Sequence, residues 1–584
     1  MKAYEEQGTD SARVRTGIML VVLAIGVGTA SGYSALALLW LIGIVQELFF
    51  GIGHGHLYSA AARLDKLHVM LAPMLGGLAV GLFMRFVVSE RRNHGPEDVM
   101  QAVHEGTHTL TLRAGLSSAL ASALAIGSGA SLGRYGPTVH LGASVAAQLG
   151  QRFQRVRAER HILVGCGVAA AISASFNAPL AGVLFAHEVV LAAFARRGFV
   201  AITIASVTGQ VIARVHGGQF TLASLSEHHI GYNHEYLLFA LVGVCGGLLA
   251  IVFIKGMDLS VRAGAQVRLP LWFKPAIAGL AVGALATHYP QVLGLGDEAI
   301  HDAIGQLFTL PLLLALMLAK LLAACVCRGF GMPGGVFGPA LFLGVMLGSA
   351  LGQSLQWVDP SLVSSLPIYA VAGMGAVTSC VIGAPITTIL IVFELTASYA
   401  LTSAVMIAVV CAHLTVNRLY PLSWFHLLLM QRGVDLYKGR TVRIMQRRQV
   451  HELLGDEQIT VTPQQSIDSV HDALLNANTT VAMICSEDGK LLGQIGLVDA
   501  VRALGSGDGS VTAGQLAVMP GIVLTQAQDL NVAMKQLRYF KGAGVPVVDA
   551  IDNMRFVGVL NQSSLIAAYG DAVSQAHEEE HGRG

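Results

Sequence analysis

The sequence predicts a polytopic α-helical membrane protein with an inverted internal repeat, broken or re-entrant helices and a C-terminal α/β domain. Three observations lead to this fold class. Hydrophobic residues make up 53% of the 584 residues and charged residues only 12%, against about 25% charged in a typical soluble domain. The charges are uneven, because residues 431–584 hold 30 of them and residues 1–430 hold the other 43. Two Gly-Pro motifs recur in order along the apolar part. This pattern excludes a soluble enzyme, a disordered chain and a secreted disulfide scaffold.

Composition also sets the expected domain boundaries. We expect a cytosolic N-terminus at 1–16, a transmembrane domain at 17–430, a linker at 431–445, a pair of α/β domains at 446–570 and a flexible tail at 571–584. Arg13, Arg15 and an arginine-rich loop at 152–160 mark cytoplasmic sides. The protein is therefore expected to span the cell membrane several times, with the lipid bilayer as its partner and its α/β tail in the cytoplasm.

Charge and cysteine usage limit the other partners. The chain has 37 basic and 36 acidic residues, which gives no reason to expect nucleic acid. Its seven cysteines show no metal-ligand spacing and imply no disulfide framework. We expect no metal site and no resident cofactor.

Apolar segments recur through the transmembrane part, and many are too short for the roughly 20 residues of a spanning helix. Irregular segments at membrane depth are tolerated only where they are buried in protein or line a polar cavity. The segments are 17–50, 70–88, 110–127, 137–151, 161–194, 198–214, 236–257, 272–287, 308–326, 335–354, 367–378 and 385–418.

Two motifs repeat in the two halves of this part. Gly133-Arg-Tyr-Gly-Pro137 aligns with Gly335-Val-Phe-Gly-Pro339, and Ala178-Pro through Glu188 aligns with Ala384-Pro through Glu394. Two halves that share Gly-Pro breaks indicate a transporter-type site at the repeat interface. Because Glu188 and Glu394 each follow their Ala-Pro at the same interval, we expect a structural role for both.

The tail also repeats. Residues 459–504 and 522–569 each read as strand, helix, strand, strand, helix. Two small α/β units in tandem, each with a short sheet to cover, should pack on each other.

The broken segments favour an anion path. A helix that starts inside the membrane points free N–H groups and a positive dipole end at its start, and such an end binds anions without a cationic side chain. Gly133 and Gly136 permit the turn, and Pro137 and Pro339 suit a first helical turn. The side chain of Arg134 is not required for this binding.

These motifs resemble those of the CLC family of chloride channels and chloride/proton antiporters, and the tail resembles the paired CBS module of many CLC proteins. The matching segments are Gly133-Arg-Tyr-Gly-Pro137, Phe176-Asn-Ala-Pro through Glu188, and Gly334-Gly-Val-Phe-Gly-Pro339. The resemblance implies a homodimer with one path for chloride or similar small anions in each subunit, and no enzyme activity. It also implies that the backbone amides at Val336 and Phe337 bind the anion.

Departures from the family pattern refine the function. The family's gating glutamate is replaced by Tyr135, next to Gly136, and the inner proton-transfer glutamate of antiporters is replaced by Val189. A phenol with a reference pKa near 10 is a poor proton carrier at neutral pH. We therefore expect passive, proton-uncoupled transport with Tyr135 as the gate; a space-filling ring at Tyr135 is the alternative.

The other pore positions are assigned by the same resemblance. His94, followed by Gly95, takes the place of the family's central serine, with a solvent-facing loop histidine as the alternative. Phe425 takes the place of the pore-lining tyrosine and lacks its hydroxyl donor.

Three further readings stay open. A CLC antiporter that uses another proton relay is the main alternative. His104-Glu105-Gly-Thr-His108 formally fits the zinc-protease pattern, so an intramembrane zinc metalloprotease is a distant one. In the tail, Asp499 matches a nucleotide-contacting aspartate of CBS modules, but a glycine replaces the preceding hydroxyl residue. Adenine nucleotide binding thus remains open, and a structural role is favoured.

Overall fold

The computed structural model divides the chain into two compact units, Met1–Asp435 and Leu436–Gly584. It describes residues 2–52, 55–88, 92–105, 110–153, 157–192, 196–217, 229–434, 440–455, 459–477, 479–505, 511–540 and 544–581.

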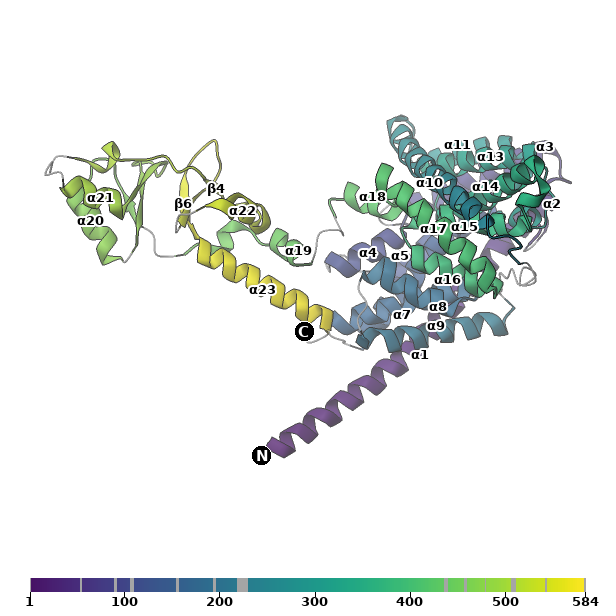
Figure 1. Ribbon diagram of the computed structural model, residues 1–584, viewed down its shortest axis with the longest axis horizontal. Helices are drawn as coiled ribbons and strands as arrows, with labels where there is room; N and C mark the ends of the chain where they lie inside the picture. Colours follow the sequence, from purple (N-terminus) through teal and green to yellow (C-terminus); the bar gives the residue numbers. More distant parts are fainter. Residues whose placement is uncertain are drawn as a thin grey trace. The chain divides into compact units, whose positions relative to one another are not determined.

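The regular elements of the first unit, within its described residues, are all helices (Figure 1). Its first half contains α1 Lys2–Phe50, α2 Leu57–Ala61, α3 Lys66–Phe86, α4 Pro96–Glu105, α5 Leu112–Gly127, α6 Tyr135–Arg152, α7 Arg157–Phe176, α8 Pro179–Phe185, the π-helix η1 Ala186–Leu191 and α9 Arg196–Val215. Its second half contains α10 Glu235–Gln266, α11 Lys274–Ala286, η3 Pro290–Val292, α12 Asp297–Ile304, α13 Leu310–Gly329, α14 Phe337–Val358, η4 Pro360–Leu362, α15 Leu366–Ile382, α16 Pro385–Thr396, α17 Tyr399–Leu419 and α18 Trp424–Gln431.

Two predicted apolar segments are each more than one helix. Segment 161–194 breaks after α7, where Asn177 has a positive φ of 55° and Pro179 begins α8. Segment 385–418 breaks between α16 and α17, where Ala397 has a φ of 49° and Ser398 caps α17. A single left-handed residue is enough to end each helix.

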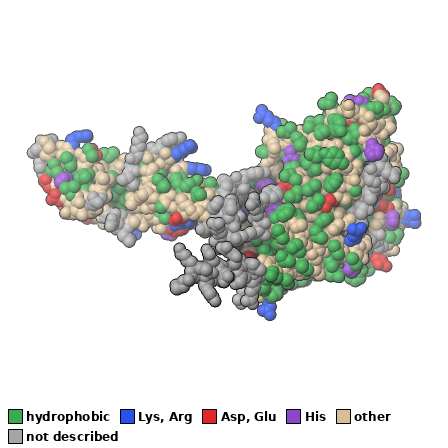
Figure 2. Space-filling view, turned by 60° about the horizontal axis from the view of Figure 1, so that its bottom comes forward, with side chains coloured by type: hydrophobic (Ala, Val, Ile, Leu, Met, Phe, Trp, Pro, Cys, Tyr) green, Lys and Arg blue, Asp and Glu red, His purple; other side chains and the backbone are tan. Residues whose placement is uncertain are grey.

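The surface of the first unit suits a lipid environment. Among the described residues, seven segments are long and apolar enough to cross a membrane: Gly17–Phe50, Lys66–Phe86, Gly198–Val215, Glu235–Gln266, Leu310–Gly329, Phe337–Val358 and Tyr399–Gln431. Figure 2 shows hydrophobic side chains over much of its visible face, with few charged ones. Large apolar side chains such as Leu48 and Leu237 are nearly four-fifths exposed, which is favourable only where lipid or another apolar surface covers them.

Corresponding elements of the two halves contact each other. Helices α3 and α11 pack together, and a Cβ at Gly279 would come within 1.9 Å of the Pro73 carbonyl oxygen. Small residues allow such close approach of membrane helices. Gly133, just before α6, pairs with Gly335, just before α14. Their amides donate to each other's carbonyls over 2.7 and 2.6 Å. The starts of the two equivalent helices are thus joined at their backbones.

The repeated glutamates cap each other's half. Glu188 accepts hydrogen bonds from the Ile386 and Thr387 amides, at 3.1 and 2.8 Å, at the start of α16. Glu394 accepts from the Leu180 and Ala181 amides, both at 2.9 Å, at the start of α8. A carboxylate at a helix start satisfies orphan amides and complements the helix dipole. These contacts are structural.

The second unit contains two three-stranded sheets, each with the predicted element order. Its elements are α19 Arg440–Arg447, η5 Val450–Leu453, β1 Thr460–Val461, α20 Ile467–Asn476, β2 Val481–Cys485, β3 Leu491–Gly496, α21 Leu497–Gly505, η6 Ala513–Gln515, β4 Leu524–Thr525, α22 Leu530–Gln536, η7 Leu537–Tyr539, β5 Gly544–Val548, β6 Phe556–Asn561 and α23 Gln562–His581. In each sheet the first strand pairs parallel with the second, and the second pairs antiparallel with the third. One apolar cluster joins Met483 and Leu491 to Val548, so the two halves pack on each other.

Two helices cross the predicted boundaries of this unit. The expected linker at 431–445 runs into α19, whose Met445 is buried in the core of the second half. The expected flexible tail at 571–584 is helical to His581, because Leu565, Ala568 and Ala572 continue one apolar stripe into that core.

The reciprocal caps are testable. Replacing Glu394 by alanine removes two charge-assisted hydrogen bonds, and we expect it to destabilise the folded protein by about 2 kcal/mol or more. The measurement is the thermal unfolding midpoint of the purified protein in detergent. Glu188→Ala should lower the midpoint similarly, whereas Glu47→Ala, at an exposed position of α1, should not. Unchanged midpoints for both cap variants would contradict the capping role.

Candidate functional site

Four helix starts meet at one small cavity in the first unit, which we call the central cavity. It has a volume of about 20 Å³, enough for about one water-sized particle. The lining residues are His94–Glu97 at the start of α4, Tyr135–Pro137 at the start of α6, Gly334–Phe337 at the start of α14, Trp424 and Phe425 of α18, and also Val139, Ile172, Phe185 and Arg328. The structure thus brings together seven residues that the sequence analysis expected at the anion path: His94, Gly95, Tyr135, Gly136, Val336, Phe337 and Phe425.

The four helix starts differ in whether a side chain accepts a hydrogen bond from their free backbone amides. At α4, Asp98 accepts from the Gly95 amide at 2.8 Å, so Gly95 lines the cavity but its N–H group is already used. At α18, the Ser423 side chain accepts from the His426 amide. The starts of α6 and α14 have no side-chain cap.

The amides of α6 and α14 are therefore the best anion donors in the cavity. The first α14 amide with a helical acceptor is that of Ala340, which donates to the Val336 carbonyl at 3.1 Å. Val336 and Phe337 precede it and have no acceptor within the helix. Uncapped N–H groups at a helix start, backed by the dipole, are suited to bind a small anion.

Three aromatic rings close over this site. The Tyr135 ring stacks on Phe176 with centroids 4.0 Å apart and an interplanar angle of 15°. Phe337 packs 5.0 Å from both rings, and all three side chains are buried. We call this set the aromatic cluster. Phe176 begins one of the family motifs but is not among the predicted site residues. Nothing in the sequence shows that the end of α7 reaches the start of α6.

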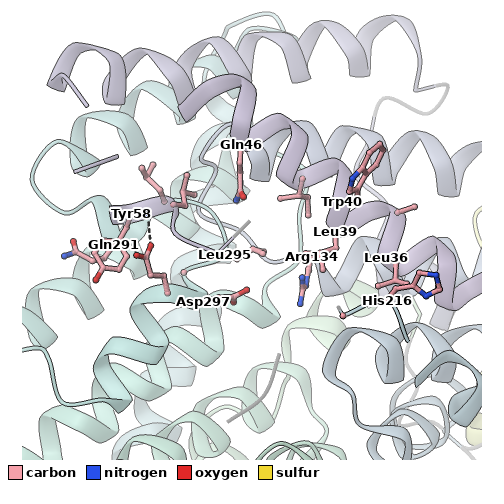
Figure 3. Close-up of a pocket in the computed structure, with 18 of the residues that line it drawn as sticks. Leu36, Leu39, Trp40, Gln46, Tyr58, Arg134, His216, Gln291, Leu295 and Asp297 are labelled. Atoms are coloured by element: carbon pink, nitrogen blue, oxygen red, sulfur yellow. Dashed lines mark hydrogen bonds between the residues drawn. The ribbon is translucent and has the colours of Figure 1, made fainter. Parts of the chain in front are cut away.

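Arg134 lies elsewhere than the other predicted pore residues. Its side chain lines a separate cavity of about 770 Å³ rather than the central cavity. Figure 3 shows Arg134 there with Trp40 of α1 and Asp297 at the start of α12. The guanidinium lies 5.3 Å from the Tyr135 ring. Arg134 and Tyr135, although adjacent in sequence, thus line two different cavities.

His94 is buried rather than solvent-facing, so the loop alternative is wrong. The residue is 8% exposed, because its ring stacks on His140 with centroids 5.2 Å apart. Its Nδ1 lies 3.8 Å from an Asp98 oxygen, which orients the ring beside the cavity.

A charge network that the sequence did not reveal adjoins the cavity. Glu97, 3% exposed, lies 3.6 Å from Arg328. Asp98 pairs with Arg92 and, at 3.1 Å, with Arg432. Among the described residues that line the central cavity, Glu97 is the one with a carboxylate side chain, and Arg328 provides the positive charge beside it. The partners are 231 residues apart in the sequence, so no local pattern indicates the pair.

Val189 is buried in η1, and it does not line the central cavity. Pro137 and Pro339 lie in the first turns of α6 and α14.

The zinc pattern gains no support from the described residues. Helix α4 ends at Glu105, and the His104 ring contacts the Met100 carbonyl at 2.8 Å. His108 and the Glu105 side chain lie outside what the structure describes. Within the described part, no group of three or more His, Cys, Asp or Glu side chains is placed to hold a metal.

Comparison with known proteins identifies relatives of the first unit. The family model for voltage-gated chloride channels matches residues 76–417. The chain is 30% identical over 395 residues to a ClcB-like protein of Ralstonia nicotianae, covering 67% of this chain and 92% of the relative. It is also 30% identical over 397 residues to the voltage-gated ClC-type chloride channel ClcB of Escherichia coli (strain SMS-3-5), covering 67% of this chain and 94% of that protein.

Solved structures share the fold. A slow cyanobacterial Cl−/H+ antiporter aligns with a TM-score of 0.63 at 22% identity, covering 71% of this chain and 97% of that one. A eukaryotic CLC transporter aligns with a TM-score of 0.63 at 18% identity, covering 94% of this chain and 98% of that one. A CLC-type fluoride/proton antiporter gives a TM-score of 0.58 at 20% identity, covering 70% of this chain and 97% of that one.

The aromatic cluster predicts how Tyr135 variants behave. Tyr135→Ala removes the ring contacts to Phe176 and Phe337, each worth about 0.5–1.5 kcal/mol beyond area burial. Halide flux into liposomes should then rise roughly tenfold, since 1.4 kcal/mol corresponds to a factor of ten.

Tyr135→Phe is the matched control, because it keeps the ring and loses only the hydroxyl. Its flux should stay close to that of the unsubstituted protein. A Tyr135→Ala protein that folds normally and conducts no faster would show that the ring does not block the path.

Proposed function

The chain belongs to the CLC family of voltage-gated chloride channels, and from that premise we propose that it moves chloride or similar small anions passively, without coupled protons. One observation carries the proposal. The uncapped starts of α6 and α14 meet in the central cavity, and the side chain over them is the neutral phenol of Tyr135. The cavity therefore suits an anion but has no carboxylate at the gate position.

The gate we propose is the aromatic cluster. Tyr135 lines the central cavity and Arg134 lines the larger cavity beside it, so an anion that passes between the two must displace the stacked rings. A carboxylate gate can be released by protonation, but a phenol is neutral at pH 5–8. Opening of the anion path at Tyr135 would thus depend on how the three rings pack, and not on protonation of the gate.

The missing carboxylates support uncoupled transport. Val189 stands at the inner relay position and is an apolar, buried residue. Glu97 does line the central cavity, but Arg328 lies 3.6 Å from it. Burial and the neighbouring Asp98 raise the pKa of the Glu97 carboxyl, and Arg328 offsets this only in part, so the support for uncoupled transport comes from Tyr135 and Val189 and not from Glu97.

A chloride/proton antiporter is the second candidate. Two structural neighbours are named as proton antiporters, and Glu97 is a buried carboxylate at the cavity. In this alternative Glu97 would take the place of the missing relay. The two functions differ in a single measurable quantity, the number of protons moved per anion.

For the assembly, we propose a homodimer in the cell membrane with the second unit in the cytoplasm, as the family resemblance implies. We also propose that the second unit is a CBS pair with a structural role. Asp499 is half exposed and lies 3.7 Å from Arg502, so the aspartate already has a cationic neighbour. Adenine nucleotide binding at Asp499 is the alternative.

Proton recording decides between the two functions. In liposomes that contain the purified protein, a chloride gradient should drive anion flux without stoichiometric proton movement. The reason is that neither Tyr135 nor Val189 carries a titratable carboxylate. The measurement follows external pH and chloride together.

Glu97→Gln is the diagnostic variant for the antiporter. If a chloride gradient drives protons uphill and Glu97→Gln abolishes that movement while chloride still flows, the protein is an antiporter with Glu97 as its relay. Uphill proton movement in any form contradicts uncoupled transport.

A further inference from the structure

A third cavity of the first unit is lined by two cationic side chains, Arg85 and Lys274, that do not line the central cavity. It has a volume of about 490 Å³ and lies between the ends of α3, α10 and α13 and the start of α11. Arg85, Lys274 and Arg328 line it, together with the apolar side chains of Leu271, Trp272 and Phe330. Among its described lining residues none is acidic. We call this cavity the basic pocket.

Two of the three cations are not neutralised within the described part of the chain. Lys274 is 8% exposed, and its Nζ donates to the Gly264 carbonyl at 2.7 Å. Arg85 lies over the Phe86 ring at 5.6 Å. Neither side chain forms an ion pair with a described carboxylate, whereas Arg328 has Glu97 at 3.6 Å. Burying a cation such as Lys274 without a counter-charge is costly, so an anionic ligand beside it that also reaches the exposed Arg85 would be stabilising.

The rim of the pocket is apolar, which tells against a ligand that is only a small ion. Leu271 is 70% exposed, and Phe86, next to Arg85, is 76% exposed. Trp272 adds an indole, a side chain that favours the boundary between membrane and water. A ligand that fits this arrangement has a charged head and an apolar body.

The position of the pocket relative to the bilayer agrees with such a ligand. Arg85 is in the last turn of a spanning helix, and Lys274 begins α11 after a loop that also holds Arg268. Basic residues at helix ends mark the cytoplasmic side, and basic pockets between membrane helices on that side bind phospholipid head groups.

We propose that the basic pocket binds the phosphate headgroup of an anionic phospholipid, with Arg85 and Lys274 as its ligands and the acyl chains along the apolar rim. The site is separate from the central cavity, although Arg328 lines both. Lipid binding here does not depend on whether transport is coupled to protons.

The test uses the purified full chain in detergent, stripped of lipid and titrated with short-chain phosphatidylglycerol. The readouts are the thermal unfolding midpoint and the number of bound lipids in native mass spectrometry. We expect saturable stabilisation of the unsubstituted protein. Arg85→Gln and Lys274→Gln should each raise the dissociation constant about tenfold, the usual scale for losing one charge-assisted contact.

Arg418→Gln is the matched control. Arg418, like Arg85, is an exposed arginine in the last turn of a long apolar helix, but it does not line the pocket. It should bind phosphatidylglycerol as the unsubstituted protein does. Because Arg85 is exposed, Arg85→Gln should fold even if Lys274→Gln does not.

Two control ligands distinguish binding of an anionic lipid from binding of acyl chains alone or of a soluble phosphate. Short-chain phosphatidylcholine tests the acyl chains without net negative charge, and glycerol phosphate tests the soluble headgroup; we expect little stabilisation from either. Equal stabilisation by glycerol phosphate would make the site one for soluble phosphate and overturn the lipid assignment. Equal binding of phosphatidylglycerol by Arg85→Gln and the unsubstituted protein would overturn the site.

Discussion

The reciprocal backbone pairing of Gly133 and Gly335 is the contact on which the proposed anion site depends. Each amide donates to the other's carbonyl, and this fixes where α6 and α14 begin. Neither position tolerates a side chain without movement, since a Cβ on Gly133 would lie 2.7 Å from the Gly338 nitrogen and one on Gly335 would lie 2.9 Å from the Gly136 nitrogen. Two helix starts are thereby held together although each repels the other's positive end.

Because positive helix ends repel each other, each pair of broken helices needs negative charge at its starts. The two pairs differ in where that charge comes from. The starts of α8 and α16 receive carboxylates from the opposite half, Glu394 and Glu188, and their dipoles are compensated inside the protein. The starts of α6 and α14 receive no side chain, so their compensation must come from outside. An anion near a helix start is worth about 0.3–1 kcal/mol, and up to about 2 when partly buried. We therefore propose that one pair of helix starts serves stability and that the other binds the transported anion.

The fold class and many residues of the central cavity could be predicted from the sequence, because local motifs indicate both. Gly-Pro breaks mark where α6 and α14 begin, and the resemblance assigned Tyr135, Phe337 and Phe425. No local sequence motif indicates the contacts between distant segments. The Glu97–Arg328 pair and the Phe176 ring depend on how α4, α7 and α13 pack, and the separate cavity of Arg134 depends on which way its side chain turns. In the second unit, Ala572 gave no signal, since alanine is common in exposed helices as well.

We expect the transported anion to be held by the uncapped backbone of α6 and α14 rather than by a cationic side chain. Anomalous diffraction from crystals grown in bromide would locate the anion directly. We expect a bromide peak in the central cavity, within hydrogen-bonding distance of the Val336 and Phe337 amides. Bromide bound only beside Arg134, with none at those amides, would contradict this mode of binding.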